Sequence, residues 1–272
     1  MVKVSVCMIT YNHANYIEKA IESILSQIGD FEIELVIAND NSPDNTDEII
    51  KKCIQNNNTK HKIKYIHNTQ NIGMMPNFEQ AINACDGDFL AICEGDDYWT
   101  SSNKIEEQVK FLSANKEFSI CFHGVAIDNK GVIEKDTITI KSNANTSIYD
   151  LAKSNYIHTC SVLYNNTDKI KLPKNFSKVK VGDYYLHMLF AKKGNIHYID
   201  SVLAHYRVHD TSYWSSKQQV EREKIWIDFI CSIKREFSSP IKKILNEQIY
   251  LMQKFRLNKW ERILLKIKLF LS

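Results

Sequence analysis

The sequence lacks the run of roughly 18 apolar residues that a transmembrane helix needs, so no membrane span is expected. Its first stretch, MVKVSVCMITYN, contains no small-residue cleavage site and is typical of a strand rather than a signal peptide. We therefore expect a cytoplasmic protein, either free or peripheral on the cytoplasmic face of the inner membrane. The chain also shows no internal repeat and no low-complexity linker.

Cysteines with metal-binding or redox spacing are missing as well. The seven cysteines are an odd number, and no two of them form a C-x-x-C pair. Several lie in apolar, strand-like runs, which is typical of small buried side chains in a reducing compartment. We predict neither a zinc site nor a disulfide framework.

The main domain also lacks an excess of basic residues. The chain has 35 Lys and Arg against 32 Asp and Glu, but residues 217–272 hold 13 of the basic and 6 of the acidic groups. That leaves 22 basic and 26 acidic groups for residues 1–216 (35 − 13 and 32 − 6). A nucleic-acid-binding domain would show the opposite balance, so no nucleic-acid partner is expected.

Strand and helix patterns alternate through the first hundred residues. Strands are predicted at Lys3–Ile9, Glu32–Ala38, Lys62–His67 and Asp88–Cys93, and helices at Asn15–Ser26, Asp44–Cys53, Pro76–Ala84 and Lys104–Leu112. Ser42 and Pro43 are the expected cap and first turn of the second helix. This alternation predicts an α/β fold with a doubly wound, Rossmann-like sheet that is mostly parallel in this half.

The pattern changes after about Ser119. We expect two antiparallel strands, 118–128 and 131–140, joined at Asn129-Lys130-Gly131. They are followed by a helix near Ser147, a strand at His158–Tyr164, a helix opening at Gly182-Asp183 and a strand at Ser201–Arg207. Helices alone are expected from Lys217 onward. The sheet is therefore predicted to be mixed, with a C-terminal helical appendage.

Polar, short side chains follow each of the first four strands. They occupy Thr10–His13, Asn39–Ser42, Asn68–Gly73 and Glu94–Asp97. In open α/β sheets, ligands bind outside the carboxyl ends of the strands. The four loops are therefore predicted to form one site.

Glu94, Asp96 and Asp97 follow directly on the apolar run FLAIC. Such carboxylates can form a general acid/base pair, a ligand set for a hard cation, or a solvated turn that caps the next helix. Adjacent residues point different ways, which disfavours a pair facing each other across a substrate. Adjacent carboxylates suit a divalent cation whose other ligands are phosphate and water, so we favour a metal site.

Four segments in this order resemble one family. VSVCMITYN, LVIANDNSPDNT, NIGMMPNFEQAINACDGDFLAICEGDDYW and HYRVHDTSYW together resemble family 2 glycosyltransferases of the A-type fold, of the kind that builds bacterial surface glycans. The resemblance covers about residues 2–215. It implies an inverting, nucleotide-sugar-dependent hexosyltransferase that is assisted by Mn²⁺ or Mg²⁺. It also implies a catalytic domain at 1–216, with a nucleotide-binding half (1–118) and an acceptor-binding half (119–216), before a helical segment at 217–272.

The resemblance also assigns roles to residues. Asp183 resembles the family's catalytic base, for which a plain helix cap is the alternative; Asp97 resembles the metal ligand, and His209 is a candidate metal or phosphate contact. The expected nucleotide-sugar contacts are Thr10, Tyr11, Asn12, Asp40, Asn71, Gly73, Asn77, Glu94, Asp96, Arg207 and Trp214. The expected partners are a UDP-sugar donor and a glycan or lipid-linked glycan acceptor, which His158 and Ser161 are candidates to face.

Two other classes of function remain open from the residues. A sugar nucleotidyltransferase shares the sheet and the metal carboxylates, but it typically has a glycine- and basic-rich loop where this chain has Thr10–His13. A non-catalytic nucleotide-sugar-binding module would leave Asp183 without a task.

The tail ends in KWERILLKIKLFLS. Trp260, Leu264, Ile267 and Leu271 fall on one face of the predicted helix, and Leu265 and Leu269 fall outside that stripe. Such a helix suits the surface of a membrane. It also suits docking on the catalytic domain, or on a second subunit in a homodimer, and we favour docking.

Overall fold

The computed structural model describes residues 1–139, 144–210, 214 and 217–270. Its strands and α-helices follow in chain order: β1 (Val2–Thr10), α1 (Ile17–Leu25), β2 (Phe31–Asn39), α2 (Thr46–Asn56), β3 (Lys62–His67), α3 (Met74–Asn83), β4 (Phe89–Ile92), β5 (Tyr98–Trp99), α4 (Lys104–Ala114), β6 (Phe118–Asn129), β7 (Val132–Lys135), β8 (Asn145–Thr146), α5 (Ile148–Leu151), β9 (Leu163–Asn165), α6 (Gly182–Ala191), β10 (Asn195–Val208), α7 (Gln219–Ile233), α8 (Ser239–Gln253) and α9 (Lys259–Phe270). Four 3-10 turns lie between them: η1 (Thr159–Ser161), η2 (Phe176–Lys178), η3 (Lys234–Glu236) and η4 (Lys254–Arg256).

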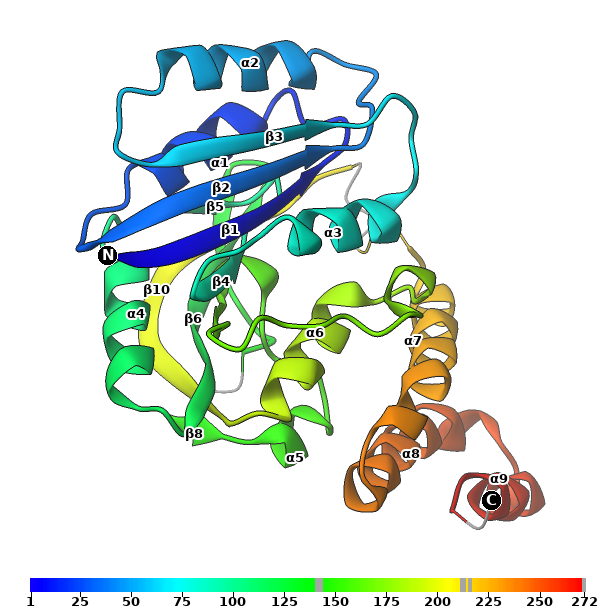
Figure 1. The fold of residues 1–272 in the computed structure, drawn as a ribbon. Helices are drawn as coiled ribbons and strands as arrows, with labels where there is room; N and C mark the ends of the chain where they lie inside the picture. The colour runs from blue at the N-terminus through cyan, green and yellow to red at the C-terminus, as the bar shows by residue number, and fades with distance from the viewer. Residues whose placement is uncertain (140–143, 211–213, 215–216, 271–272) are drawn as a thin grey trace.

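Within the described residues, ten strands form one mixed sheet (Figure 1). Its main path runs β3-β2-β1-β4-β9-β6-β10-β5, with β7 beside β6 and β8 beside β10. The pairs among β3, β2, β1 and β4 are parallel, as predicted for the first half. Strand β9 is antiparallel to both of its neighbours, whereas β6 and β10 run parallel. The α/β class and the mixed sheet are confirmed.

Helices cover both faces of the sheet, because alternate strand residues are apolar on both sides. One buried cluster joins Val4, Val6 and Met8 of β1 to apolar residues of α1, α2 and α4. The other cluster joins the opposite face to α3, α5, α6, α7 and α8. Figure 1 shows the sheet between these two layers, with α7, α8 and α9 as a tail beside it. The helical C-terminal segment is thus confirmed. The boundary drawn at residue 216 stays a prediction.

The start of α2 differs from the prediction. The helix begins at Thr46 with Asn45 as its N-cap, three residues after Pro43. Ser42 is used elsewhere: its hydroxyl donates to Asn39 Oδ1 at 2.6 Å and accepts the backbone N–H of Asn12 at 3.0 Å. Because Ser42 ties two loops together in this way, it does not cap the helix.

The predicted strand at His158–Tyr164 is wrong for its first half. Ser161 donates both its backbone N–H and its hydroxyl to the carbonyl of His158, which closes the turn η1. Only Leu163–Asn165 is a strand. In the predicted hairpin, β7 ends at Lys135. Residue 140 of that hairpin and Leu271 of the tail lie outside the described residues.

Candidate active site

The carboxyl ends of β1, β2, β3 and β4 lie at one edge of the sheet, and backbone hydrogen bonds join the loops there. Asp40 donates its N–H to the carbonyl of Thr10, and Asn68 donates to the carbonyl of Asn39, both at 3.0 Å. Gly95 donates to the carbonyl of Ile9 at 3.0 Å. The four polar loops are therefore brought together as the sequence predicts.

Asp40 is the centre of the loop that follows β3. The backbone N–H groups of Ile72 and Gly73 donate to its two carboxylate oxygens, each at 2.8 Å, and the Asn68 side chain adds a third bond at 3.2 Å. Asn71 donates to the carbonyl of Asp40 at 3.2 Å. The predicted contacts Asp40, Asn71 and Gly73 are thus adjacent. Oδ2 of Asp40 accepts one of these bonds, so its second lone pair can take a ring N–H donor.

The other contacts predicted for the nucleotide differ in accessibility. Asn77 is buried and is held by Asn68 at 3.0 Å and by the carbonyl of Ala38 at 2.9 Å, which makes it a support for the loops. Tyr11 is 47% exposed at the end of β1 and can reach a ligand. Asn12 has a φ of 61°, a left-handed conformation that turns the chain sharply out of β1.

A close approach of two loops explains Gly95. A Cβ atom at this position would lie 2.7 Å from Thr10 Oγ1 and 2.9 Å from Ile17 Cδ1. Those distances are shorter than side chains tolerate. Glycine is therefore required between Glu94 and Asp96, and the backbone packing directs these two carboxylates.

His13, Asp96 and His209 form a group that can hold a metal ion. One ligand atom from each residue lies within 4.8 Å of the other two. Asp96 Oδ2 is 3.0 Å from His209 Nε2 and 3.7 Å from His13 Nε2. Asp96 Oδ1 is buried without a hydrogen-bond partner among the described residues, which leaves it available as a ligand. The group fits a divalent cation, and its two imidazoles suit manganese better than magnesium.

Asp97 lies outside this group. Its Oδ1 accepts the backbone N–H of Arg207 at 2.8 Å, and the side chain is buried. The prediction from sequence paired Asp97 with His209 at the metal, whereas the structure groups His209 with Asp96 and His13. The structure places Asp96 Oδ2 against His209, and Asp97 Oδ1 against the backbone of Arg207.

The guanidinium of Arg207 is held beside the acidic loop. Its Nη1 donates to the carbonyl of Asp96 at 2.8 Å, and its Nε is 3.6 Å from Asp128 Oδ2. It lies 4.2 Å from the ring centroid of Tyr98 and 5.2 Å from that of Tyr16, which are cation–π distances. These contacts fix a positive charge near the group.

The carboxylates of the acidic loop have pKa values that are shifted in different directions. Burial, followed by repulsion from neighbouring carboxylates, raises the pKa of Glu94 and of Asp97 well above the usual values. Burial alone would raise the pKa of Asp96 too, but His13 and His209 outweigh it and lower that pKa. Burial lowers the pKa of His13, so its imidazole is neutral near pH 7, the form that binds metals.

Asp183 is the second residue of α6, after Gly182, and Val181 is the N-cap position. Its Oδ2 accepts a hydrogen bond from the Asn155 side chain at 3.3 Å. Burial raises the pKa of Asp183, partly offset by hydrogen bonds and by His158. The charge of Asp183 in turn raises the pKa of Glu94, as expected for carboxylates on the same edge.

Two further residues named from sequence, His158 and Trp214, have other observed partners. His158 Nε2 is 3.1 Å from Asp136 Oδ1, with both side chains buried, and the His158 ring packs on Tyr206 at 5.1 Å. Trp214 packs on Trp226 of α7 at 6.3 Å. Its observed contact is therefore with the tail.

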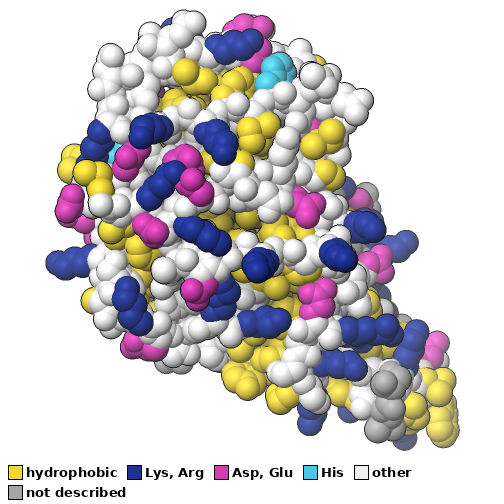
Figure 2. All heavy atoms as spheres, in the orientation of Figure 1, with side chains coloured by type: hydrophobic (Ala, Val, Ile, Leu, Met, Phe, Trp, Pro, Cys, Tyr) yellow, Lys and Arg dark blue, Asp and Glu magenta, His cyan; other side chains and the backbone are white. Residues whose placement is uncertain are grey.

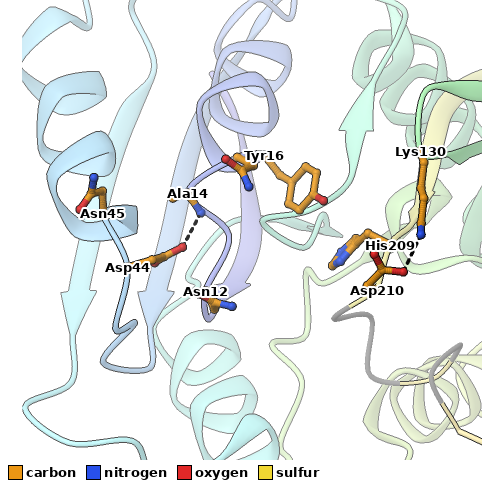
Figure 3. A pocket seen from close by; sticks show the side chains of 9 residues that line it. Asn12, Ala14, Tyr16, Asp44, Asn45, Lys130, His209 and Asp210 are labelled. Atoms are coloured by element: carbon orange, nitrogen blue, oxygen red, sulfur yellow. Dashed lines mark hydrogen bonds and ion pairs between the residues drawn. The ribbon is translucent and has the colours of Figure 1, made fainter.

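A pocket of about 560 Å³ adjoins the group through His209 (Figure 3). It is lined by Asn12, Ala14, Asn15, Tyr16, Asp44, Asn45, Lys130, His209 and Asp210. Tyr16 stacks on His209 with ring centroids 4.6 Å apart, and Lys130 pairs with Asp210 at 2.5 Å. The volume is within the range of small-molecule sites.

Sequence reasoning placed His13 in a loop of the predicted site without giving it a role, and it did not place Tyr16, Asp44 or Lys130 in the site. His13 had a usable signal, because it ends the polar loop after the first strand. Lys130 had none, because it lies in the turn between β6 and β7 and reaches the site only through the folding of β6 beside β10.

The fold is that of A-type glycosyltransferases. The model of glycosyl transferase family 2 matches residues 5–170. This chain belongs to that family.

Relatives in sequence are consistent with this. An uncharacterized protein of Mycobacterium tuberculosis is 33% identical over 224 residues, which are 82% of this chain and 63% of that protein. This chain thus spans less than two thirds of that relative's length. An uncharacterized glycosyltransferase of Rickettsia typhi is 28% identical over 248 residues, covering 88% of this chain and 75% of that protein.

Two solved structures share the fold. S. aureus TarS 1–349, in complex with UDP-GlcNAc, gives a TM-score of 0.69 at 16% identity over 94% of this chain and 73% of that chain. The mannosyltransferase PcManGT from Pyrobaculum calidifontis, in complex with GDP-Man and Mn²⁺, gives 0.67 at 17% identity over 91% of this chain and 69% of that chain. The expected A-type fold is confirmed.

Proposed function

We propose that this chain is an inverting glycosyltransferase that moves a sugar from a UDP-sugar to an acceptor hydroxyl. The acceptor is a glycan or a lipid-linked glycan in the assembly of a polysaccharide on the cytoplasmic side. The observation that supports this best is the group His13, Asp96 and His209 at the edge of the sheet where the half-buried carboxylate of Asp183 also raises the pKa of Glu94. The donor class is supported by UDP-GlcNAc and GDP-Man in the two structures of similar fold.

In this proposal His13, Asp96 and His209 hold Mn²⁺ or Mg²⁺. When bound, such an ion acts as a Lewis acid toward the negative charge of the leaving nucleoside diphosphate. Arg207, fixed by the carbonyl of Asp96 and by two tyrosine rings, adds a second positive charge for the diphosphate.

Asp97 has a positioning role in this proposal. It fixes the backbone of Arg207 near the end of β10, and His209 follows two residues later, just beyond Val208, the last residue of the strand. The hydrogen bond from Arg207 to Asp97 therefore sets where His209 meets Asp96. This assigns the metal to Asp96 and keeps Asp97 as the anchor of β10.

Asp183 takes the proton of the acceptor hydroxyl. Burial raises its pKa, which strengthens it as a base while Asn155 orients one of its oxygens. The hydroxyl oxygen forms the new bond to the anomeric carbon as the bond to the diphosphate breaks. The nucleobase is bound by the edge formed by Tyr11, Asp40 and the loop 71–73.

The test is a panel of UDP, GDP, CDP and dTDP, each measured by thermal shift with and without Mn²⁺. We expect stabilisation by UDP that depends on Mn²⁺. The variant Asp183→Asn should keep that shift, yet lose roughly 100- to 10,000-fold in transfer from a UDP-sugar, because only the base is removed. Glu107→Ala, at an exposed position of α4, is the matched control and should change neither.

No nucleotide shift for the wild type would contradict the donor site. Transfer by Asp183→Asn at close to the wild-type rate would contradict the base but leave the donor site intact. The two failures are therefore distinguishable.

A further inference from the structure

The C-terminal helix α9 has two unlike faces. Leu269 is buried and Leu265 is half-buried against the core cluster that includes residues of α8. The side chain of Asn246 in α8 donates a hydrogen bond to the carbonyl of Leu269. One face of α9 is therefore docked on the protein, as one interpretation of the sequence predicted.

The other face is apolar and exposed. Its side chains are Trp260, Ile263, Leu264, Ile267 and Phe270, which are 37–75% exposed. At about 100° per residue, these five positions fall within an arc of about 120° on the opposite side from Leu265 and Leu269. This is a continuous apolar stripe, because every position in that arc of the described helix is apolar.

Basic side chains border the stripe on both sides. Lys259 and Lys266 flank one edge, and Lys268 lies beyond the other. The twelve residues of α9 contain four basic groups and one acidic group, Glu261, a net charge of +3 (4 − 1). The helix therefore combines apolar surface with positive charge.

Among the described residues, no other helix exposes more than one large apolar side chain. Helix α2 covers the opposite face of the sheet, and Ile54, at 36%, is its one large apolar residue with that much exposure among those described. The exposed stripe of α9 is thus particular to the tail. Phe255 of η4, 80% exposed between Lys254 and Arg256, is a further exposed apolar side chain of the tail. Figure 2 shows apolar side chains among Lys and Arg at this end of the molecule.

We propose that α9 binds an anionic lipid surface, with Trp260, Leu264 and Ile267 inserted among the lipids and the flanking lysines at the headgroups. Helices that lie in the membrane interface have this combination of an apolar face, Trp and Lys or Arg. Protein–protein interfaces are instead depleted in Lys. Among the described residues no helix is both long and apolar enough to span a bilayer, so α9 lies along the surface.

Insertion and docking use different faces, so both occur together. Leu265 and Leu269 keep α9 on α8 while the opposite stripe enters the lipid. Binding of α9 then attaches the whole chain to the lipid surface, because α8 and α7 pack on the catalytic domain through the same buried cluster. This inference is independent of the proposed glycosyl transfer.

The experiment is co-sedimentation of the full chain with two kinds of vesicle: phosphatidylcholine alone, and phosphatidylcholine with about a third phosphatidylglycerol. The wild type should bind the anionic vesicles and be released by salt. For the double variant Leu264→Glu/Ile267→Glu, the affinity for the anionic vesicles should fall at least about tenfold. Val220→Glu, at an apolar residue of α7 that is 61% exposed, is the matched control and should bind as the wild type does.

Trp260 supplies a second readout. Its indole fluorescence should shift to shorter wavelength on the anionic vesicles, and the variant Trp260→Phe should bind but lose the shift. Equal sedimentation of the double variant and the wild type would overturn the proposal. So would a homodimer in solution that Leu264→Glu separates, because a second copy would then cover the stripe.

Discussion

Among the described residues, the sheet edge buries polar atoms that lack hydrogen bonds, whereas the tail exposes apolar side chains to water. At the edge, Asp96 Oδ1 and Asp97 Oδ2 are buried without hydrogen-bond partners in the described part of the chain. In the tail, Trp260 and Leu264 are apolar and mostly exposed. Buried carboxylate oxygens without a hydrogen bond and exposed apolar surface both destabilise a folded monomer in water.

The difference indicates what each region binds. A bound cation would neutralise the buried carboxylates at the edge, and His13 and His209 lie where they can act as its further ligands. An anionic lipid surface would cover the exposed apolar stripe of the tail and pair with its lysines. In both regions the residues that face the binding partner lie beside residues that anchor them: Asp97 at the edge, and Leu265 and Leu269 in the tail.

The largest expected effect separates the two aspartates at the edge. Asp96→Asn should lower Mn²⁺-dependent nucleotide affinity about 100-fold or more, because an amide is a poor substitute for a carboxylate ligand. Asp97→Asn should leave it within about threefold, because the amide oxygen still accepts the N–H of Arg207. Calorimetric titration of the nucleotide measures both. If Asp97→Asn lost more nucleotide affinity than Asp96→Asn, Asp97 would be the metal ligand instead.

A smaller effect separates the two faces of α9. Leu269→Ala should weaken the docking of the helix by about 2 kcal/mol, because it removes a buried side chain. Leu264→Ala, on the exposed face, should change the free energy of unfolding by less than about 0.5 kcal/mol. Hydrogen exchange of the α9 amides without lipid reports both. Equal effects would mean that the exposed stripe is covered by protein.

The smallest expected effect concerns the charge of Glu94. Its pKa is raised in the folded state, so its contribution to stability is complete below the unfolded pKa of about 4.3 and is lost as pH rises through the folded pKa. Glu94→Gln avoids that loss. The metal-free variant should exceed the wild type by on the order of 1 kcal/mol at about pH 8, and by less at about pH 5.

Urea unfolding with a chelator present measures this difference at both pH values. Comparing the variant with the wild type at each pH cancels the titration of the buried histidines, which both proteins share. A gain that is the same at both pH values would show that Glu94 is not desolvated by its neighbours.

Much of the site could be predicted because it lies at strand ends. Alternating strands and helices put Thr10, Asp40, the loop 68–73 and Asp96 at one edge before any contact is known. Contacts distant in sequence were beyond prediction. Lys130 reaches the pocket, and Arg207 reaches Asp97, only through the pairing of β6 with β10 and the position of β5.

The sequence by itself determined the α/β fold, the parallel first half, the acidic strand end and the helical tail, because each depends on local periodicity and spacing. The tertiary structure decided that Asp96 faces His209, whereas Asp97 Oδ1 accepts the backbone N–H of Arg207, 110 residues away. It also decided which leucines of α9 are docked, because helical periodicity gives the faces of a helix but not its neighbour. Packing chose Leu265 and Leu269, and it left the stripe of Trp260 exposed.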